Sequence, residues 1–428
     1  MRAGTTVAAL VGIVVIATVA FALRHVEFAP DHANAFIGSQ ACGRCHAGIS
    51  DQWKASLHHK MMRRTDEPGA VLAKWGGSGA QPAFSLDDTV WVVGSKWEQQ
   101  FMGRDKGRDT MLGGAWSVGL KNWTMQGWDG WQAPVPEDRC HGCHVVGLDV
   151  KSGHFVEPGI GCESCHGQGL WHAEASGHGP VYAKLDSEVC GQCHTRGHAP
   201  TGPYFFPVNY ELGSPLDASF SEVKADFIQN SSQWWGNGRE RDRHQEYPAW
   251  RRGGHADALK VLTVGYDDRY GKAGPECLRC HSAEAAVYPG RPLAMADAKN
   301  GITCVVCHNV HGALEETRST CESCHDQGPF HHQAVALKDH VPCPTTAGVK
   351  CENCHMPVTV KVGGQYHLHS HAPGITSPED GAKFESPSSC ANGGCHNETP
   401  GSKLQQDFEV FYRKPNSIDA EQRVQQAP

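Results

Sequence analysis

Cys162-Glu163-Ser164-Cys165-His166 contains the pentapeptide Cys-x-x-Cys-His, the pattern that decides the fold of this chain. Two thiols at this spacing can form thioether bonds with the two vinyl groups on one edge of a porphyrin. The imidazole that follows then lies under the iron as an axial ligand. One short turn therefore provides both covalent attachment and iron ligation, and the motif predicts a haem c.

The pentapeptide occurs eight times, and we number the copies in chain order as sites 1 to 8. A single Cys-x-x-Cys pair could hold zinc or form a disulfide, but neither role needs a histidine directly after every pair. We therefore expect eight haem c groups with their irons. The cysteines are Cys42 and Cys45, Cys140 and Cys143, Cys162 and Cys165, Cys190 and Cys193, Cys277 and Cys280, Cys304 and Cys307, Cys321 and Cys324, and Cys351 and Cys354. The proximal iron ligands are His46, His144, His166, His194, His281, His308, His325 and His355.

A ninth copy with wider spacing is Cys390-Ala-Asn-Gly-Gly-Cys395-His396, which we call site 9. Four residues rather than two separate its cysteines, and the two glycines would let the longer loop bulge. His396 keeps the place of the proximal ligand. The segment predicts a ninth haem, and the alternative is a disulfide between Cys390 and Cys395.

The chain has more histidines than proximal ligation needs. With the nine motif histidines set aside, 18 of the 27 remain, and many follow a motif closely. Bis-histidine ligation gives a low-spin iron that suits electron transfer and is closed to substrates. For any one of these histidines, a role on the surface or as a partner of a haem propionate is the alternative. The candidate distal iron ligands are His59, His172, His198, His255, His311, His331, His332, His369 and His371.

The composition indicates an interior filled by something other than side chains. Hydrophobic residues make up 39%, while 49 glycines, 25 prolines, 27 histidines and 19 cysteines favour turns and ligands over a core. The formal net charge is −8, and no dense Lys/Arg run with interleaved aromatic residues is present. We therefore expect no nucleic-acid partner.

An uncharged, largely apolar run at residues 3–23 predicts export from the cytoplasm. Its 21 residues exceed the usual signal-peptide core and are enough to span a bilayer, which favours a retained membrane anchor. The alternative is secretion after cleavage near Ala35. In both cases residues 36–428 are expected outside the cytoplasm, on the periplasmic side.

The positions of the motifs predict the organisation of the chain. Most neighbouring motifs within a haem region are only 17 to 30 residues apart, too few for independent domains, so neighbouring haems must pack closely. The expected segments are an anchor or signal peptide at 1–35, an N-terminal haem region with four haems at 36–200, a haem-free strap at 201–275, a C-terminal haem region with five haems at 276–400 and a polar tail at 401–428.

Local patterns predict a mostly α, haem-packed fold with extensive loops and a small β-meander. The insert at about 69–132 combines β-branched and aromatic residues with turn signals, which favours strands. Trp53, Leu57 and Met61 recur at helical spacing within residues 49–62. A short helix is also expected around residues 256–262, and residues 413–428 are expected to be disordered or extended.

Five segments resemble the multihaem cytochrome family that includes the tetrahaem electron acceptor of hydroxylamine oxidoreductase. They are residues 38–58, 159–172, 244–255, 301–312 and 354–357, which are spread over most of the span 36–396. The resemblance implies an α-rich, haem-packed fold with mostly bis-histidine haems. It also implies second ligands at His59, His172, His255 and His311. This chain has more haems than the tetrahaem members and a wider ninth motif.

Closely packed haems allow electrons to hop from one to the next. We therefore expect an electron-transfer protein rather than an enzyme with its own substrate site. It would link membrane quinol oxidation or a periplasmic donor to a redox protein partner, alone or assembled with copies of itself. The alternative is a multihaem oxidoreductase for a nitrogen or sulfur compound, with one iron open to substrate. Histidines are plentiful and the chain has no Cys-x-x-Cys-Lys motif, which favours the electron-transfer protein.

Overall fold

The computed structural model describes residues 32–124, 139–264, 273–313, 321–325, 350–391, 396 and 399–413. Five features of the sequence lie outside these residues: the apolar run at 3–23, the candidate ligands His331 and His332, Cys395 of site 9, and residues 414–428 of the expected disordered or extended tail. None of the described helices is both long enough and apolar enough to cross a membrane.

Each regular haem motif folds as, or at the end of, one short helical turn. At site 1 the backbone N–H groups of Cys45 and His46 donate to the Cys42 carbonyl at 3.2 and 3.0 Å. Residues three and four apart share a face of a helix, so both sulfurs and the imidazole project to one side. The turns are α2 (Ser39–Gly43), α5 (His141–His144), α6 (Cys162–His166), α8 (Glu188–Gly191), α11 (Leu278–His281), α13 (Cys304–Cys307), α14 (Glu322–His325) and α16 (Cys351–His355).

The other helices are also short, and among the described ones only α3 and α18 exceed seven residues. They are α3 (Ala47–Ala55), α7 (Leu170–Glu174), α9 (Glu246–Arg251), α10 (Ala258–Val264), α12 (Ala283–Val287), α17 (Pro378–Phe384) and α18 (Gly401–Arg413). Four 3₁₀ turns are η1 (Leu86–Asp88), η2 (Leu216–Ala218), η3 (Pro275–Cys277) and η4 (Met295–Asp297). Helix α10 overlaps the short helix expected from the sequence, and α18 opens the segment expected as a polar tail.

Helix α3 is shorter than its apolar spacing suggested. It ends at Ala55, because Ser56 takes an extended conformation and its hydroxyl donates to the Trp53 carbonyl at 2.6 Å. Met62, the expected end of the helical stretch, instead begins strand β1. The prediction of a helix up to Met62 is therefore wrong.

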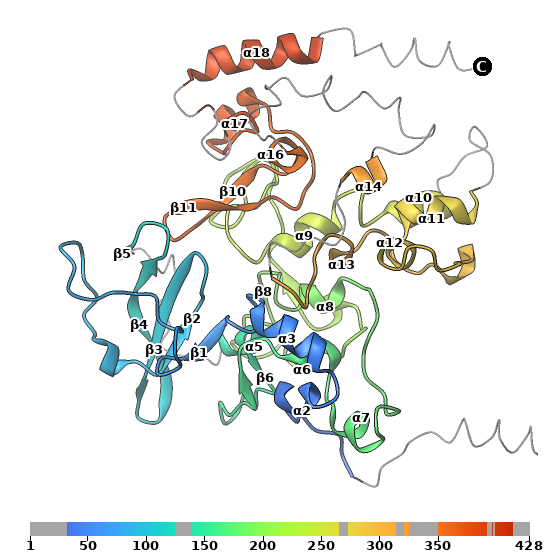
Figure 1. Ribbon diagram of the computed structural model, residues 1–428. Helices are drawn as coiled ribbons and strands as arrows, with labels where there is room; N and C mark the ends of the chain where they lie inside the picture. The colour runs from blue at the N-terminus through green and yellow to red at the C-terminus, as the bar shows by residue number, and fades with distance from the viewer. Residues whose placement is uncertain are drawn as a thin grey trace, which may run out of the picture.

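A five-stranded antiparallel sheet lies to one side of the motif turns (Figure 1). Its strands pair in chain order, as in the meander expected from the sequence. Buried Phe101, Trp116 and Trp123 pack together in its core. The strands are β1 (Met62–Arg64), β2 (Trp91–Val93), β3 (Glu98–Asp105), β4 (Arg108–Ser117) and β5 (Asn122–Thr124).

Three pairs of short antiparallel strands join other segments. They are β6 (Val145–Val146) with β7 (Glu157–Pro158), β8 (Gly197–His198) with β9 (Ser221–Glu222), and β10 (Val358–Val362) with β11 (Gln365–His369). Helical residues outnumber strand residues in the described chain. The predicted combination of short helices, extensive loops and a small meander is therefore confirmed.

Candidate haem-binding sites

A connected cavity of about 3100 Å³ runs between the motif turns, and the proximal histidines of sites 1 to 8 all line it. A pocket for one small molecule usually measures about 300–1,000 Å³. The cavity is therefore large enough for several macrocycles, and the proximal histidines that line it place it where haems would be attached.

Pairs of imidazole rings face each other across the cavity. A metal–imidazole bond is about 2 Å long and the ring centre lies about 1 Å further, so two imidazoles on one iron have centres about 6 Å apart. The rings of His46 and His172 are 6.2 Å apart, with 22° between their planes. Those of His166 and His311 are 6.1 Å apart at 18°. Sites 1 and 3 thus each have a predicted candidate at ligand distance.

Two further predicted candidates lie opposite sites 6 and 7. The ring of His371 is 6.1 Å from that of His308, and the ring of His255 is 6.1 Å from that of His325. Both partners are distant in the chain from the motif that they face. The structure therefore brings four of the nine candidate distal ligands to a proximal histidine.

Site 4 faces His58 rather than its neighbour His59. The ring of His58 lies 6.4 Å from that of His194. The ring of His59 instead packs against Trp53, with their centres 4.3 Å apart. The sequence predicted His59, but after helix α3 ends it is His58 that lines the cavity.

Site 2 faces His244, which was not among the candidates. Its ring lies 6.5 Å from that of His144 and 6.1 Å from that of His194, so it stands between sites 2 and 4. The backbone of His244 has φ of 63°, a left-handed conformation that is uncommon outside glycine and is often found at functional sites. The ring Nδ1 bonds to the Cys193 carbonyl at 2.8 Å, and the backbone N–H donates to Glu246 Oε1 at 3.2 Å. The one sequence signal was that His244 begins a segment resembling the family.

Several rings use Nδ1 to bond to a backbone carbonyl, which leaves Nε2 for iron. Such bonds fix the tautomer and the orientation of a metal-binding imidazole. The pairs are His166 with Tyr182 at 2.6 Å, His172 with Gly179 at 2.9 Å, His244 with Cys193 at 2.8 Å, and His281 with Ala258 at 2.9 Å. The donor set and its orientation fit haem iron.

Burial keeps other ligand candidates neutral. It lowers the pKa of His58 and of His371 to about 4, and that of His144 to about 3. Neutral imidazole is the form that coordinates a metal. These rings are therefore ready to bind iron at neutral pH without losing a proton.

The remaining candidates are placed differently. His198 is exposed on strand β8. On strand β11, His369 bonds through Nδ1 to the Met356 carbonyl at 2.5 Å, directly after site 8. Since His331, His332 and Cys395 lie outside the described residues, the second ligands of sites 5, 8 and 9 stay predictions.

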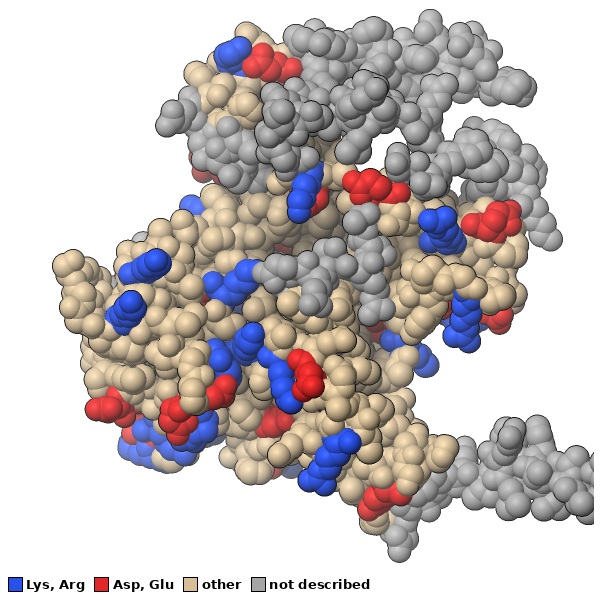
Figure 2. Space-filling model, viewed as in Figure 1, with Lys and Arg blue, Asp and Glu red and all other residues tan. Residues whose placement is uncertain are grey.

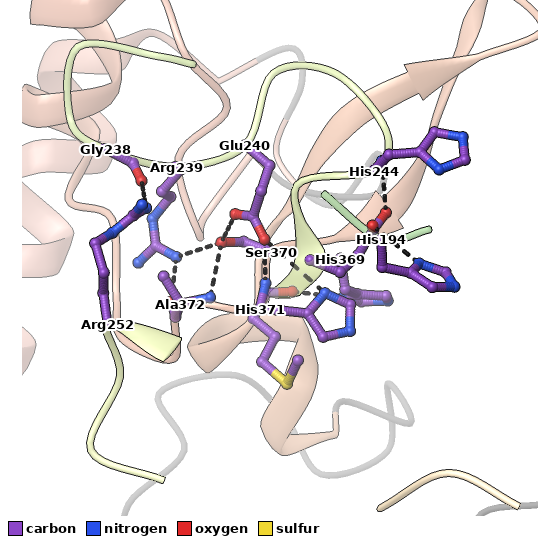
Figure 3. Close-up of polar contacts among 12 residues, drawn as sticks. His194, Gly238, Arg239, Glu240, His244, Arg252, His369, Ser370, His371 and Ala372 are labelled. Carbon is purple, nitrogen blue, oxygen red and sulfur yellow. Dashed lines mark hydrogen bonds and ion pairs between the residues drawn. The ribbon is translucent and has the colours of Figure 1, made fainter. Parts of the chain in front are cut away.

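A buried polar network holds the segment that carries His371 (Figure 3). Glu240 accepts the His371 backbone N–H at 2.6 Å and the Ser370 hydroxyl at 2.5 Å. Arg239 donates to Ser370 Oγ at 3.2 Å and to the Ala372 carbonyl at 2.7 Å. Glu240 is only 2% exposed, and burial raises its pKa to about 7. Residues of the strap thus fix a ligand that faces site 6.

Contacts between motif turns group sites 1 to 4. The Cys162 N–H of site 3 donates to Ser39 Oγ in the turn of site 1 at 2.9 Å. Gln192 of site 4 donates to the Ser164 carbonyl of site 3 at 3.0 Å, and its own carbonyl oxygen lies 3.9 Å from Cys143 Sγ of site 2. Site 4 therefore touches sites 2 and 3, and site 3 touches site 1.

Further contacts lead from site 4 to sites 6 and 7. The Cys304 N–H of site 6 donates to Ser187 Oγ, just before the turn of site 4, at 3.3 Å. Ile302, two residues before site 6, donates its N–H at 2.9 Å to the carbonyl of His255, which faces site 7. Site 6 thus lies between sites 4 and 7.

The row continues to site 9, with site 5 at its side. Cys280 Sγ of site 5 approaches the carbonyl oxygen of Cys324 in site 7 at 4.0 Å. Cys351 Sγ of site 8 contacts Glu322 of site 7 at 3.8 Å, and Ser389, next to site 9, donates to the Cys354 carbonyl of site 8 at 2.7 Å. In Figure 1 the turns run from α2 at the bottom through α6, α8 and α13 to α14 and α16.

Two family models match parts of the chain. The model for cytochrome c7 and related cytochrome c matches residues 265–326, and that for cytochrome c554 and c-prime matches residues 124–167. The C-type polyhaem cytochrome OmcB of Geobacter sulfurreducens is 23% identical over 217 residues, which cover 44% of this chain. The match spans only 22% of that relative's length.

Two solved structures share the fold over most of the chain. Outer cell wall cytochrome OcwA is 27% identical, with a TM-score of 0.75 and coverage of 88% of this chain and 86% of that one. The undecahaem cytochrome from the S-layer of Carboxydothermus ferrireducens is 20% identical, with a TM-score of 0.54 and coverage of 90% and 61%. The second likeness concerns the fold alone.

The motifs, the facing imidazoles and these matches define a c-type cytochrome with several haems. The chain belongs to the multihaem c-type cytochrome family. This confirms the resemblance drawn from the sequence.

Proposed function

We propose that this protein conducts electrons along a branched row of nine covalently held haems. The observation that supports this function is the unbroken series of contacts between motif turns, in the order 1, 3, 4, 6, 7, 8 and 9. Site 2 branches from site 4, and site 5 branches from site 7. Haem, when bound, supplies the one-electron redox chemistry, while the chain holds the macrocycles close together and tunes them.

The facing imidazoles suggest which side chains close each iron to substrates. Two axial histidines per iron would leave no open position, which suits transfer rather than catalysis. The distal ligands that we infer are His172 for site 1, His244 for site 2, His311 for site 3, His58 for site 4, His371 for site 6 and His255 for site 7.

We infer a location outside the cytoplasm. The apolar run at residues 3–23 supports it, either as a retained anchor or as a signal removed near Ala35. The name of the structural relative OcwA, which refers to an outer cell wall, also supports it. The donor would be a membrane quinol-oxidising complex or a periplasmic carrier, and the acceptor a redox protein. Figure 2 shows positive and negative side chains interspersed on one face, so docking there would use a mosaic of charges.

Electron injection at one end of the row tests the proposal. A ruthenium photosensitiser is coupled to a cysteine introduced at Lys54, whose side chain is 58% exposed beside site 1, in a Cys343→Ala background. Repeated flashes should reduce every haem of the wild-type row. A variant lacking site 6, with Cys304→Ala and Cys307→Ala, should fill only sites 1 to 4, because the contacts pass through site 6.

The matched control removes site 5, which lies beside the row, instead of site 6, which lies within it. Cys277→Ala with Cys280→Ala deletes site 5 by the same chemical change, and electrons should still reach all remaining haems. If the variant without site 6 fills completely at the wild-type rate, the proposed row is wrong. A high-spin haem that responds to nitrite or sulfite would instead favour the oxidoreductase alternative.

A further inference from the structure

His194, the proximal histidine of site 4, bonds to a carboxylate instead of a backbone carbonyl. Its Nδ1 lies 3.1 Å from Glu246 Oε2. The Nδ1 atoms of His166, His172 and His281 bond to main-chain oxygens. A negatively charged acceptor draws the Nδ1 proton more strongly than a neutral carbonyl does, and charge-assisted hydrogen bonds are about twice as strong. The ligand at site 4 therefore differs chemically from these three.

Glu246 is held firmly in its place. It is the first residue of helix α9, and its other oxygen, Oε1, accepts the backbone N–H of His244 at 3.2 Å. The carboxylate is only 20% exposed, whereas 43% of the His194 side-chain surface is open toward the cavity. Both of its oxygens thus accept a hydrogen bond, one with the His194 ring and one from the backbone, as a carboxylate does.

Site 4 is also the junction of the row. Contacts through Gln192 join it to sites 2 and 3, and the contact at Ser187 joins it to site 6. An electron that moves from site 2 to site 6 would cross this point. The potential at site 4 thus affects transfer through this branch point.

We propose that Glu246 is a positioning residue that lowers the reduction potential of the haem at site 4. By partly withdrawing the Nδ1 proton, the carboxylate makes His194 a more anionic donor, and such a donor stabilises ferric iron over ferrous iron. Reduction adds one electron from a neighbouring haem and moves no proton. The inference rests on the proposed function. A low potential at site 4 implies that electrons pass through this haem without keeping it reduced at equilibrium.

The test is a spectroelectrochemical titration of the holoprotein with Glu246→Gln. Glutamine keeps an oxygen to accept the His194 bond but removes the charge. One one-electron component should move upward, with its reduction equilibrium changed about tenfold, which is about 59 mV. Electron paramagnetic resonance should show one altered low-spin signal, while the haem count stays constant.

Glu188→Gln is the matched control. Glu188 opens the turn of site 4, and its Oε2 accepts the Leu216 N–H at 3.0 Å rather than a ring proton. The control should move the same component much less, since it removes a nearby charge without changing the ligand. Equal shifts in the two variants, or no shift in Glu246→Gln, would overturn the inference.

Two outcomes separate this inference from the proposed function. If Glu246→Gln shifts no potential but electrons still cross the row, only the role of Glu246 fails. If the wild-type protein lacks a haem at site 4, the conduit itself fails. Should Glu246→Gln not accumulate, Glu246→Asp keeps the charge on a shorter side chain and should weaken the bond to His194. A smaller upward shift of the same component would then support the inference, and none would refute it.

Discussion

The imidazole rings of His166 and His311 face each other with their centres 6.1 Å apart and their planes 18° from parallel. The two residues are far apart in the chain, and His311 lies directly after site 6. The ligand that faces site 3 is therefore supplied by the segment of another site. Such an exchange couples the positions of neighbouring haems through the backbone.

We expect His311→Ala to convert one haem from low-spin to high-spin, because alanine leaves the iron at site 3 with a single axial ligand. Quantitative electron paramagnetic resonance of the oxidised protein would show one new high-spin centre. His198→Ala is the control, since His198 is exposed on strand β8. A fully low-spin spectrum for His311→Ala would show that another group holds the iron of site 3.

Adjacent histidines allow a sharper comparison. His58→Ala should produce one high-spin haem, because the ring of His58 faces His194 at 6.4 Å. His59→Ala should keep every haem low-spin and only weaken packing on Trp53. The two spectra, recorded on proteins with equal haem content, decide between the neighbours. A high-spin signal in His59→Ala alone would reverse the assignment.

The ninth site can be tested by counting haems. Cys390→Ala with Cys395→Ala should reduce the pyridine haemochrome count from nine to eight, because both thioether bonds are lost. If Cys390 and Cys395 instead form a disulfide, the wild-type protein would already contain eight haems and the variant would contain the same number. Intact mass measured after reduction separates the two cases independently.

The haem motifs could be predicted because their chemistry is local. Both sulfurs and the proximal imidazole come from five consecutive residues, so no tertiary information is needed. The meander was equally accessible, since strand residues such as Phe101 and Trp116 alternate with turn signals. Helix α3 was overestimated because side-chain spacing does not reveal the Ser56 hydroxyl bond that ends it.

The distal ligands depend on tertiary contacts, which spacing does not encode. His371 faces site 6 where Glu240 of the strap accepts its backbone N–H. His244 faces site 2 from a left-handed backbone conformation. The distance of a histidine along the chain from the nearest haem motif therefore predicted the distal ligands poorly. It favoured exposed His198 and missed His244.

The sheet face that carries Phe101 should be energetically separate from the haem row, whereas Met102 on the sheet packs in a cluster with Cys140 of site 2. Phe101→Ala removes a fully buried ring from the sheet core and should lower the free energy of unfolding by about 3–5 kcal/mol. Haem spectra should not change, because this cluster consists of the sheet and its own loops. Leu86→Ala, at a side chain that is 43% exposed, should change stability by less than about 0.5 kcal/mol. Denaturant unfolding followed by circular dichroism checks both values.

The hydrogen bonds from the His371 segment to Glu240 predict that stability and iron ligation are linked. Glu240→Ala would leave the backbone N–H of His371 and the Ser370 hydroxyl without their acceptor, and it would leave the buried Arg239 guanidinium without a nearby carboxylate. Leaving a buried donor without its acceptor costs about 1–3 kcal/mol per group. We therefore expect a large loss in the free energy of unfolding.

Glu240→Gln separates the hydrogen bond from the charge. The amide oxygen can still accept the His371 N–H, so this variant should lose much less stability than Glu240→Ala. Only Glu240→Ala should also release part of the haem at site 6 to a high-spin form, since its facing ligand His371 is no longer held. Denaturant unfolding and electron paramagnetic resonance on the same samples measure both effects. Equal behaviour of the two variants would mean that the network does not position the ligand.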